Sequence, residues 1–144
     1  MLDIKPLTGA LGAEVGGIDL RRTLNDSEVR TVRKLLNTYE VIFFRDQYIS
    51  PQQQKELALS LGPLQTHPAY DTVEGFPEIT ILESTAEKPT KIEVWHSDMT
   101  FRQHPPMATV LRSITVPPRG GDTLWSSMSA AYDGLSESMQ RFLQ

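Results

Sequence analysis

The sequence predicts an α+β fold in which helices flank a mainly antiparallel sheet. Helical hydrophobic spacing dominates the first half of the chain, and proline-punctuated runs of β-branched and aromatic residues dominate the second. The composition is that of an ordinary globular domain, with 39% hydrophobic and 22% charged residues among 144. No internal repeat or low-complexity stretch is visible, so a single compact domain is expected over residues 1–144.

The first 44 residues predict short strands, one helix and a further strand. Glycines at four positions break the apolar run of residues 4–20, which favours brief strands joined by tight turns. Asn25 and Glu28 resemble a capping box, and apolar residues then recur at helical spacing as far as Tyr39. The β-branched and aromatic run at residues 41–44 predicts a short, fully buried strand.

A second helix is predicted to begin after Ser50. Serine at the N-cap, Pro51 at the first helical position and Gln53 at the third agree with one another, and Gly62 with Pro63 ends the pattern. Strands are then expected over residues 78–82, 93–101, 108–114 and 123–126. A last helix is expected from Ser136, where the chain stops as though cut inside or just after it.

Charge and cysteine content exclude several classes of function. Lys and Arg total 14 against 18 Asp and Glu, so the net charge of −4 provides no broad basic surface for nucleic acid. The chain has no cysteine, which leaves His, Asp and Glu as possible metal ligands. The N-terminus has no apolar run, so no secretory signal is expected. No membrane association is expected either, and the expected location is cytoplasmic.

His96 and Asp98 are the most informative pair for chemistry. On a regular strand, side chains two residues apart point to the same face, so an imidazole nitrogen and a carboxylate oxygen would lie close together. Such a pair can occupy two adjacent positions on one metal, as in a site of two histidines and one carboxylate on iron(II). The short pattern alone also fits an ordinary hydrogen-bonded surface histidine.

Several separated motifs, in the same order, resemble the TauD/TfdA family of iron(II)- and 2-oxoglutarate-dependent dioxygenases. The similarity covers almost the whole chain. Its motifs are residues 12–20, 41–47, 50–54, 67–70 (HPAY), 95–101 (WHSDMTF), 105–106 and 120–125 (GGDTLW). The resemblance implies a double-stranded β-helix (jelly-roll) core with flanking helices, of which this chain is the N-terminal part, apparently truncated at its C-terminus.

The family resemblance also implies a reaction and its cofactors. Iron, as Fe(II), is the metal, 2-oxoglutarate is the cosubstrate, and dioxygen and a small-molecule substrate are the partners. The expected reaction hydroxylates a small organic sulfonate or sulfate ester, releasing sulfite or sulfate, while 2-oxoglutarate is decarboxylated to succinate. A homo-oligomer is expected.

Matched residue by residue, the family's first metal histidine falls on His96 and its metal carboxylate on Asp98. The threonine that helps to bind 2-oxoglutarate falls on Thr123. The substrate-binding positions fall on His67, Tyr70, Met99 and Phe101. Phe101 lies three residues from Asp98 and so would not share its face on a regular strand.

Two departures from the family pattern leave alternatives open. Ile92 stands where taurine-type enzymes have an asparagine, which puts taurine itself in doubt. The family's second metal histidine and its arginines lie beyond Gln144, and His104 is interpreted as structural. A catalytically inactive fragment or pseudoenzyme is therefore the main alternative, and a zinc-dependent hydrolase with three protein ligands is the second.

Overall fold

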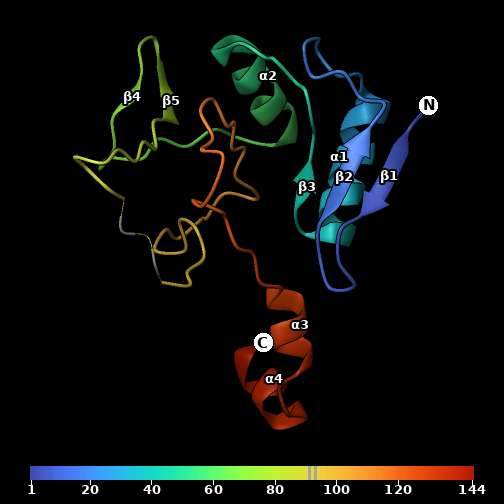
Figure 1. Cartoon of the computed structure of the whole chain (residues 1–144). Coiled ribbons are helices and arrows are strands. Elements are labelled where there is room, and N and C mark those ends of the chain that lie inside the picture. The colour runs from blue at the N-terminus through green and yellow to red at the C-terminus, as the bar shows by residue number, and fades with distance from the viewer. Residues whose placement is uncertain (91, 93) are drawn as a thin grey trace. The chain divides into compact units, whose positions relative to one another are not determined.

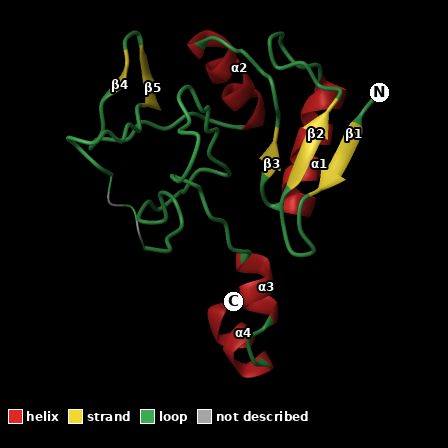
Figure 2. Ribbon diagram, in the orientation of Figure 1, coloured by secondary structure: helices red, strands yellow, loops and turns green. Residues whose placement is uncertain are grey.

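A computed structural model describes residues 1–90, 92 and 94–144 of the chain (Figure 1). The chain divides into two units, each with its own internal contacts. The first unit comprises residues 1–19, 26–47 and 114–144, and the second comprises residues 20–25 and 48–113. Helices and strands are both present (Figure 2), so the predicted mixture of α and β elements is confirmed.

A three-stranded sheet organises the first unit. Its strands are β1 (Asp3–Pro6), β2 (Ala13–Gly16) and β3 (Ile42–Phe43), in the order β1-β2-β3. Strands β1 and β2 pair antiparallel, whereas β2 and β3 pair parallel. Helix α1 (Asp26–Tyr39) connects the parallel pair and packs against β3. Parallel neighbours need such a crossover, whereas the tight turn before β2 suffices for the antiparallel pair.

The buried residues of the first unit include residues on both β2 and α1. The alternate residues Ala13 and Val15 of β2 are buried, as are Val32 and Leu35, three positions apart on α1. Spacing of two on a strand and of three on a helix places each pair on one face. Gly17 follows at φ +83°, where an added Cβ would collide with the Met1 carbonyl, so this close approach requires glycine.

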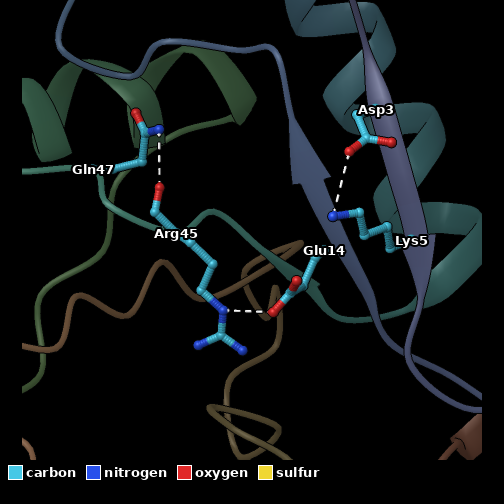
Figure 3. Close-up of polar contacts among 5 residues, drawn as sticks. All are labelled: Asp3, Lys5, Glu14, Arg45 and Gln47. Carbon is cyan, nitrogen blue, oxygen red and sulfur yellow. Dashed lines mark hydrogen bonds and ion pairs between the residues drawn. The ribbon is translucent and has the colours of Figure 1, made fainter.

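Polar contacts on the first unit lie at its surface (Figure 3). Arg45 Nε donates to Glu14 Oε1 at 2.7 Å, and Gln47 Nε2 donates to the Arg45 carbonyl at 3.2 Å. Lys5 Nζ lies 3.7 Å from Asp3 Oδ2. Because the two ion pairs are solvent-exposed and screened, they contribute little to stability compared with the apolar contacts of β2 and α1.

The predicted burial of residues 41–44 is wrong. All four are only half-buried. Strand β3 is the last strand of its sheet in the order observed among the described residues, so β2 covers one of its edges and its other edge has no strand beside it.

Two short helices follow in the first unit, α3 (Met128–Asp133) and α4 (Glu137–Leu143). The predicted Ser136 N-cap of α4 is confirmed, since its side chain accepts from the Met139 amide. Helix α3 was not predicted. Its N-cap, Ser127, accepts from the Ala130 amide at 2.9 Å and donates to Glu40 Oε1 at 2.8 Å, which fixes the start of the helix.

The second unit is built on α2 (Pro51–Leu61) and the hairpin of β4 (Thr72–Val73) and β5 (Phe76–Thr80). The predicted capping box is confirmed: Ser50 accepts from the Gln53 amide, and the Gln53 side chain accepts from the Ser50 amide. Helix α2 packs against β5, where Lys55 forms an ion pair with Glu78.

Three of the four expected strands after Pro63 are not observed. Strand β5 overlaps the expected strand at residues 78–82, but residues 94–101, 108–114 and 123–126 are not in strands. Glu93, where one was expected to begin, lies outside the described residues. Met99 adopts φ +57° within a turn, and the Val110 carbonyl accepts a hydrogen bond from Gln54 Nε2 at 3.1 Å. Neither arrangement follows from the β-branched composition on which the strands were predicted.

Ser50→Ala should destabilise the second unit by about 1 kcal/mol, because it removes the hydroxyl that accepts from the Gln53 amide. Urea unfolding followed by far-UV circular dichroism would measure the change. Ser60→Ala is the matched control in the same helix, since Ser60 Oγ only donates back to the Leu57 carbonyl. Equal effects of the two substitutions would contradict the capping role.

No helix among the described residues combines the length and the apolar character needed to cross a membrane.

Candidate functional site

His96 and Asp98 face each other across a short gap. His96 Nε2 lies 3.2 Å from Asp98 Oδ1, and both side chains are about half exposed. The predicted proximity is therefore present, but its predicted origin is wrong, because residues 98–101 form a turn rather than part of a strand. The turn closes with the Arg102 amide donating to the Met99 carbonyl at 3.1 Å.

The protonation of His96 follows from its backbone contact. Nδ1 lies 2.9 Å from the Val94 carbonyl, an acceptor, so Nδ1 carries the proton. In the neutral imidazole Nε2 then presents a lone pair toward Asp98 Oδ1, which also presents lone pairs. His96 Nε2 and Asp98 Oδ1, 3.2 Å apart, therefore attract each other only when a cation lies between them. That cation can be a proton or a metal ion.

The pKa of the His96 imidazole is raised from its ordinary value. The hydrogen bond to the Val94 carbonyl is the largest cause of the rise. Desolvation is the next largest effect and opposes it, while the negative charge of Asp98 and its hydrogen bond add smaller upward contributions. The pair is thus arranged to hold positive charge at Nε2.

The spacing of the two donor atoms fits a shared metal ion. Two ligand atoms each about 2.1 Å from one ion and at a right angle to each other are about 3.0 Å apart. The observed 3.2 Å is close to this separation. The Nδ1 contact to a backbone carbonyl is also the usual way in which a metal-bound histidine is oriented.

Thr109 orients the carboxylate of Asp98. Its Oγ1 donates to Asp98 Oδ2 at 3.2 Å, which leaves Oδ1 directed toward His96. The two carboxylate oxygens therefore have different partners. Sequence reasoning did not single out Thr109, because a lone threonine eleven residues away carries no recognisable spacing signal.

Within the described part of the chain, no third His, Asp or Glu joins the pair to form a group of three possible metal ligands. His67 and His104 belong to the same unit as His96 but have other contacts. The Ala69 amide donates to His67 Nδ1 at 3.2 Å, and the His104 carbonyl accepts from Gln65 Nε2 at 3.0 Å.

Three of the four predicted substrate residues lie together. The rings of His67 and Tyr70 are 4.7 Å apart between centroids, and the ring of Phe101 meets that of His67 edge-on at 6.3 Å. On a regular strand Phe101 would not have shared the face of Asp98. This prediction does not apply, because residue 101 lies in the turn. Tyr70 and Phe101 are exposed at 45% and 71%, so this cluster is open to a ligand.

Met99 and Thr123 are the remaining predicted residues. Met99 is half-buried at a positive φ, a conformation that is uncommon for a residue other than glycine. Thr123 is exposed in a loop of the first unit, after two glycines with φ near +70°. The pair of His96 and Asp98 and the cluster of His67, Tyr70 and Phe101 both belong to the second unit.

The fold and these motifs place the chain in a known enzyme family. The model of the taurine catabolism dioxygenase TauD, TfdA family matches residues 3–144. The chain therefore belongs to this family, and the resemblance predicted from its motifs is confirmed.

Individual relatives agree with this assignment. The chain is 35% identical over 140 residues to an alpha-ketoglutarate-dependent sulfate ester dioxygenase of Pseudomonas putida, covering 96% of the chain and 46% of that protein. It is 33% identical to an alkylsulfatase of Acinetobacter baylyi, and the match covers 99% of the chain and 45% of that protein. A crystal structure of a taurine dioxygenase from Burkholderia xenovorans matches with a TM-score of 0.82 at 37% identity, covering 99% and 50%.

The chain spans about half the length of the curated relatives that it matches.

Thr109→Val should weaken metal binding by about tenfold, because the hydrogen bond that orients the Asp98 carboxylate is lost while side-chain volume is kept. Paramagnetic broadening of the His96 ring signals during a titration with manganese(II) would measure the affinity. Thr109→Ser retains the hydroxyl and should bind nearly as the unsubstituted chain does. A loss of binding in the serine variant equal to that in the valine variant would contradict the orienting role.

Proposed function

We propose that the whole protein is an iron(II)- and 2-oxoglutarate-dependent dioxygenase that hydroxylates a small organic sulfate ester or sulfonate. The observation that carries this proposal is the pairing of His96 Nε2 with Asp98 Oδ1, fixed from both sides by Val94 and Thr109. Membership of the TauD/TfdA family supports it independently.

His96 and Asp98 are the proposed protein ligands of the iron. Neutral imidazole nitrogen and carboxylate oxygen suit iron(II), and the hydrogen bond to Val94 leaves the Nε2 lone pair available. Bound iron(II) would supply the activation of dioxygen that is coupled to the oxidation of 2-oxoglutarate and substrate. This chain's own residues hold the two donor atoms at the required spacing.

His67, Tyr70 and Phe101 are the proposed substrate-binding cluster, and Met99, in the same turn as Phe101, is a further proposed substrate residue. Because His67 Nδ1 accepts from the Ala69 amide, the neutral ring carries its proton on Nε2. Nε2–H and the Tyr70 hydroxyl can then donate to oxygen atoms of a sulfate or sulfonate group. The Phe101 ring offers an apolar surface for the carbon chain next to that group.

Thr123 is the proposed contact to 2-oxoglutarate. Its hydroxyl can donate one hydrogen bond to a carboxylate, which the neighbouring Leu124 could not. A jelly-roll core, a homo-oligomer and a cytoplasmic location remain part of this proposal.

A sulfate ester is the preferred substrate. The relative from Pseudomonas putida is named for sulfate esters and that from Acinetobacter baylyi for alkyl sulfates. Ile92 replaces the asparagine of taurine-type enzymes with an apolar side chain, which fits an alkyl chain better than the amine of taurine.

The test is succinate formation by the whole protein with iron(II), ascorbate and 2-oxoglutarate, comparing an alkyl sulfate with taurine. We expect substrate-dependent succinate formation that is faster with the alkyl sulfate. No succinate with either compound would support the alternative of an inactive protein. The 144-residue chain alone should bind iron weakly and give no turnover, because no third ligand joins His96 and Asp98 in its described part.

A further inference from the structure

An open hollow of about 550 Å³ lies in the second unit, next to the substrate-binding cluster in sequence. Its six lining residues come from two short segments: Leu64, Gln65, Thr66, Arg102, Gln103 and His104. None of these six side chains is a carboxylate. The first segment directly precedes His67, and the second directly follows Phe101.

Hydrogen bonds join the two segments. Arg102 Nη2 donates to the Thr66 carbonyl at 2.7 Å, and Gln65 Nε2 donates to the His104 carbonyl at 3.0 Å. The Phe101 ring also meets the His67 ring edge-on. The guanidinium of Arg102 is therefore anchored beside residues that the proposed function assigns to the substrate.

The charge of Arg102 has no counter-ion among the described residues. One of its five N–H donors is bonded, to Thr66, and the guanidinium carbon lies 5.9 Å from the centre of the Phe101 ring. Its Nε–H is buried with no acceptor. A buried guanidinium donor without an acceptor is unfavourable, and an anion is the group that best relieves it.

We propose that Arg102 binds the oxyanion of the substrate's sulfate or sulfonate group in this hollow. The inference rests on the proposed function and adds a residue to its substrate site. Gln103 and His104, which also line the hollow, offer further donors. The chain as a whole has a net charge of −4, so anion binding here depends on this local arrangement rather than on a general attraction.

One competing arrangement needs no ligand. Gln65 Oε1 is also buried without a donor, so a small shift could pair it with Arg102 Nε–H. The anion site and this pairing with Gln65 differ in a measurable way. Only in the anion site is the Arg102 Nε–H free to respond to an added anion.

The test follows the arginine Nε–H signals of the 144-residue chain by ¹H–¹⁵N NMR, without iron or 2-oxoglutarate. Inorganic sulfate, hexyl sulfate and hexanol are titrated separately at constant ionic strength. We expect saturable shifts of the Arg102 signal with both anions and none with hexanol. An unchanged Arg102 signal would support pairing with Gln65 and overturn the proposal. Binding of inorganic sulfate without hexyl sulfate would assign the hollow to a free anion and overturn its substrate role.

Arg102→Met removes the charge and keeps an unbranched side chain, so it should weaken hexyl sulfate binding by roughly ten- to hundredfold. Binding by the variants is followed on backbone amide signals of residues 64–66. Arg30→Met, at an exposed position of α1, is the matched control and should bind unchanged. Arg102→Lys keeps the charge, so its affinity for hexyl sulfate should lie between those of Arg102→Met and the control. This variant keeps the test decisive if Arg102→Met folds poorly. Unweakened binding by both Arg102 variants would overturn the proposal.

The outcome is separable from that of the proposed function. In the whole protein, Arg102→Met should raise the KM for the sulfate ester and change kcat much less. If the whole protein gave no succinate while sulfate still shifted the Arg102 signal, the dioxygenase proposal would fail and the anion site would stand. Normal turnover with an unchanged KM in Arg102→Met would overturn the substrate role of Arg102 and leave the dioxygenase proposal intact.

Discussion

Asp98→Ala is expected to abolish iron-dependent turnover of the whole protein and to lower the metal affinity of the 144-residue chain by more than about a hundredfold. Loss of a residue that merely orients a metal ligand typically lowers affinity about 10- to 100-fold, and here a proposed ligand itself is removed. The fold should remain largely intact, because the Asp98 side chain is 57% exposed and takes no part in the core.

The measurements are succinate formation for the whole protein and manganese(II)-induced broadening of NMR signals for the chain. Asp133→Ala is the matched control, because Asp133 is an exposed aspartate at the end of α3 in the other unit. It should leave both measurements unchanged. Full turnover in the Asp98 variant would remove Asp98, and with it the pair, from the metal site.

Metal affinity is expected to fall about tenfold for each pH unit below the pKa of His96, because a proton and the metal ion compete for Nε2. The Val94 carbonyl and the Asp98 charge raise that pKa from its ordinary value of 6.5. The decline on acidification should therefore begin at a higher pH than for an ordinary histidine.

The sign for folding stability is opposite to that for metal binding. Since the folded-state pKa of His96 is raised, its charged pairing with Asp98 stabilises the metal-free fold below the unfolded pKa. That contribution is lost as the pH rises through the folded pKa. Metal binding, in contrast, is strongest above the folded pKa.

An NMR titration of the His96 ring protons in the metal-free chain gives the pKa directly, and manganese(II) titrations at several pH values give the affinity. His104→Gln is the control and should leave both profiles in place. A His96 pKa at or below 6.5 would contradict the roles of Val94 and Asp98 in holding the proton.

Elements defined by neighbouring residues could be predicted from the sequence. The start of α2 depends on Ser50, Pro51 and Gln53, whose preferences act within one helical turn, and it is observed as predicted. The parallel partner of β2 could not be predicted in this way, because Ala13 and Ile42 are distant in the chain and neither marks the other.

His96 and Asp98 show both what residue spacing can predict and what it cannot. The spacing of His96 and Asp98 predicted their proximity, but through a strand that Met99 interrupts with its positive φ. Methionine has no preference for that conformation, so nothing in the residue type signals the turn. Thr109 was missed because its contact depends on how a later segment returns to Asp98.

The contact between His67 and Phe101 is also non-local. Only the family motifs indicated that these residues act together, since residue spacing alone predicted that Phe101 would face away. Strands predicted at residues 108–114 and 123–126 failed for a related reason. The amino-acid composition of a segment indicates its propensity to form a strand. A strand forms only where a neighbouring strand pairs with its backbone hydrogen-bonding groups.

The turn that carries Asp98 has a consequence for biosynthesis. Val94, His96, Asp98 and the closing contact from Met99 to Arg102 all fall within nine successive positions, so the entropy of loop closure that opposes their assembly is small. Loops of this length close within about 10 to 100 ns, far faster than a ribosome adds one residue. The turn that brings the imidazole and the carboxylate together can thus close before Thr109 makes its contact with Asp98.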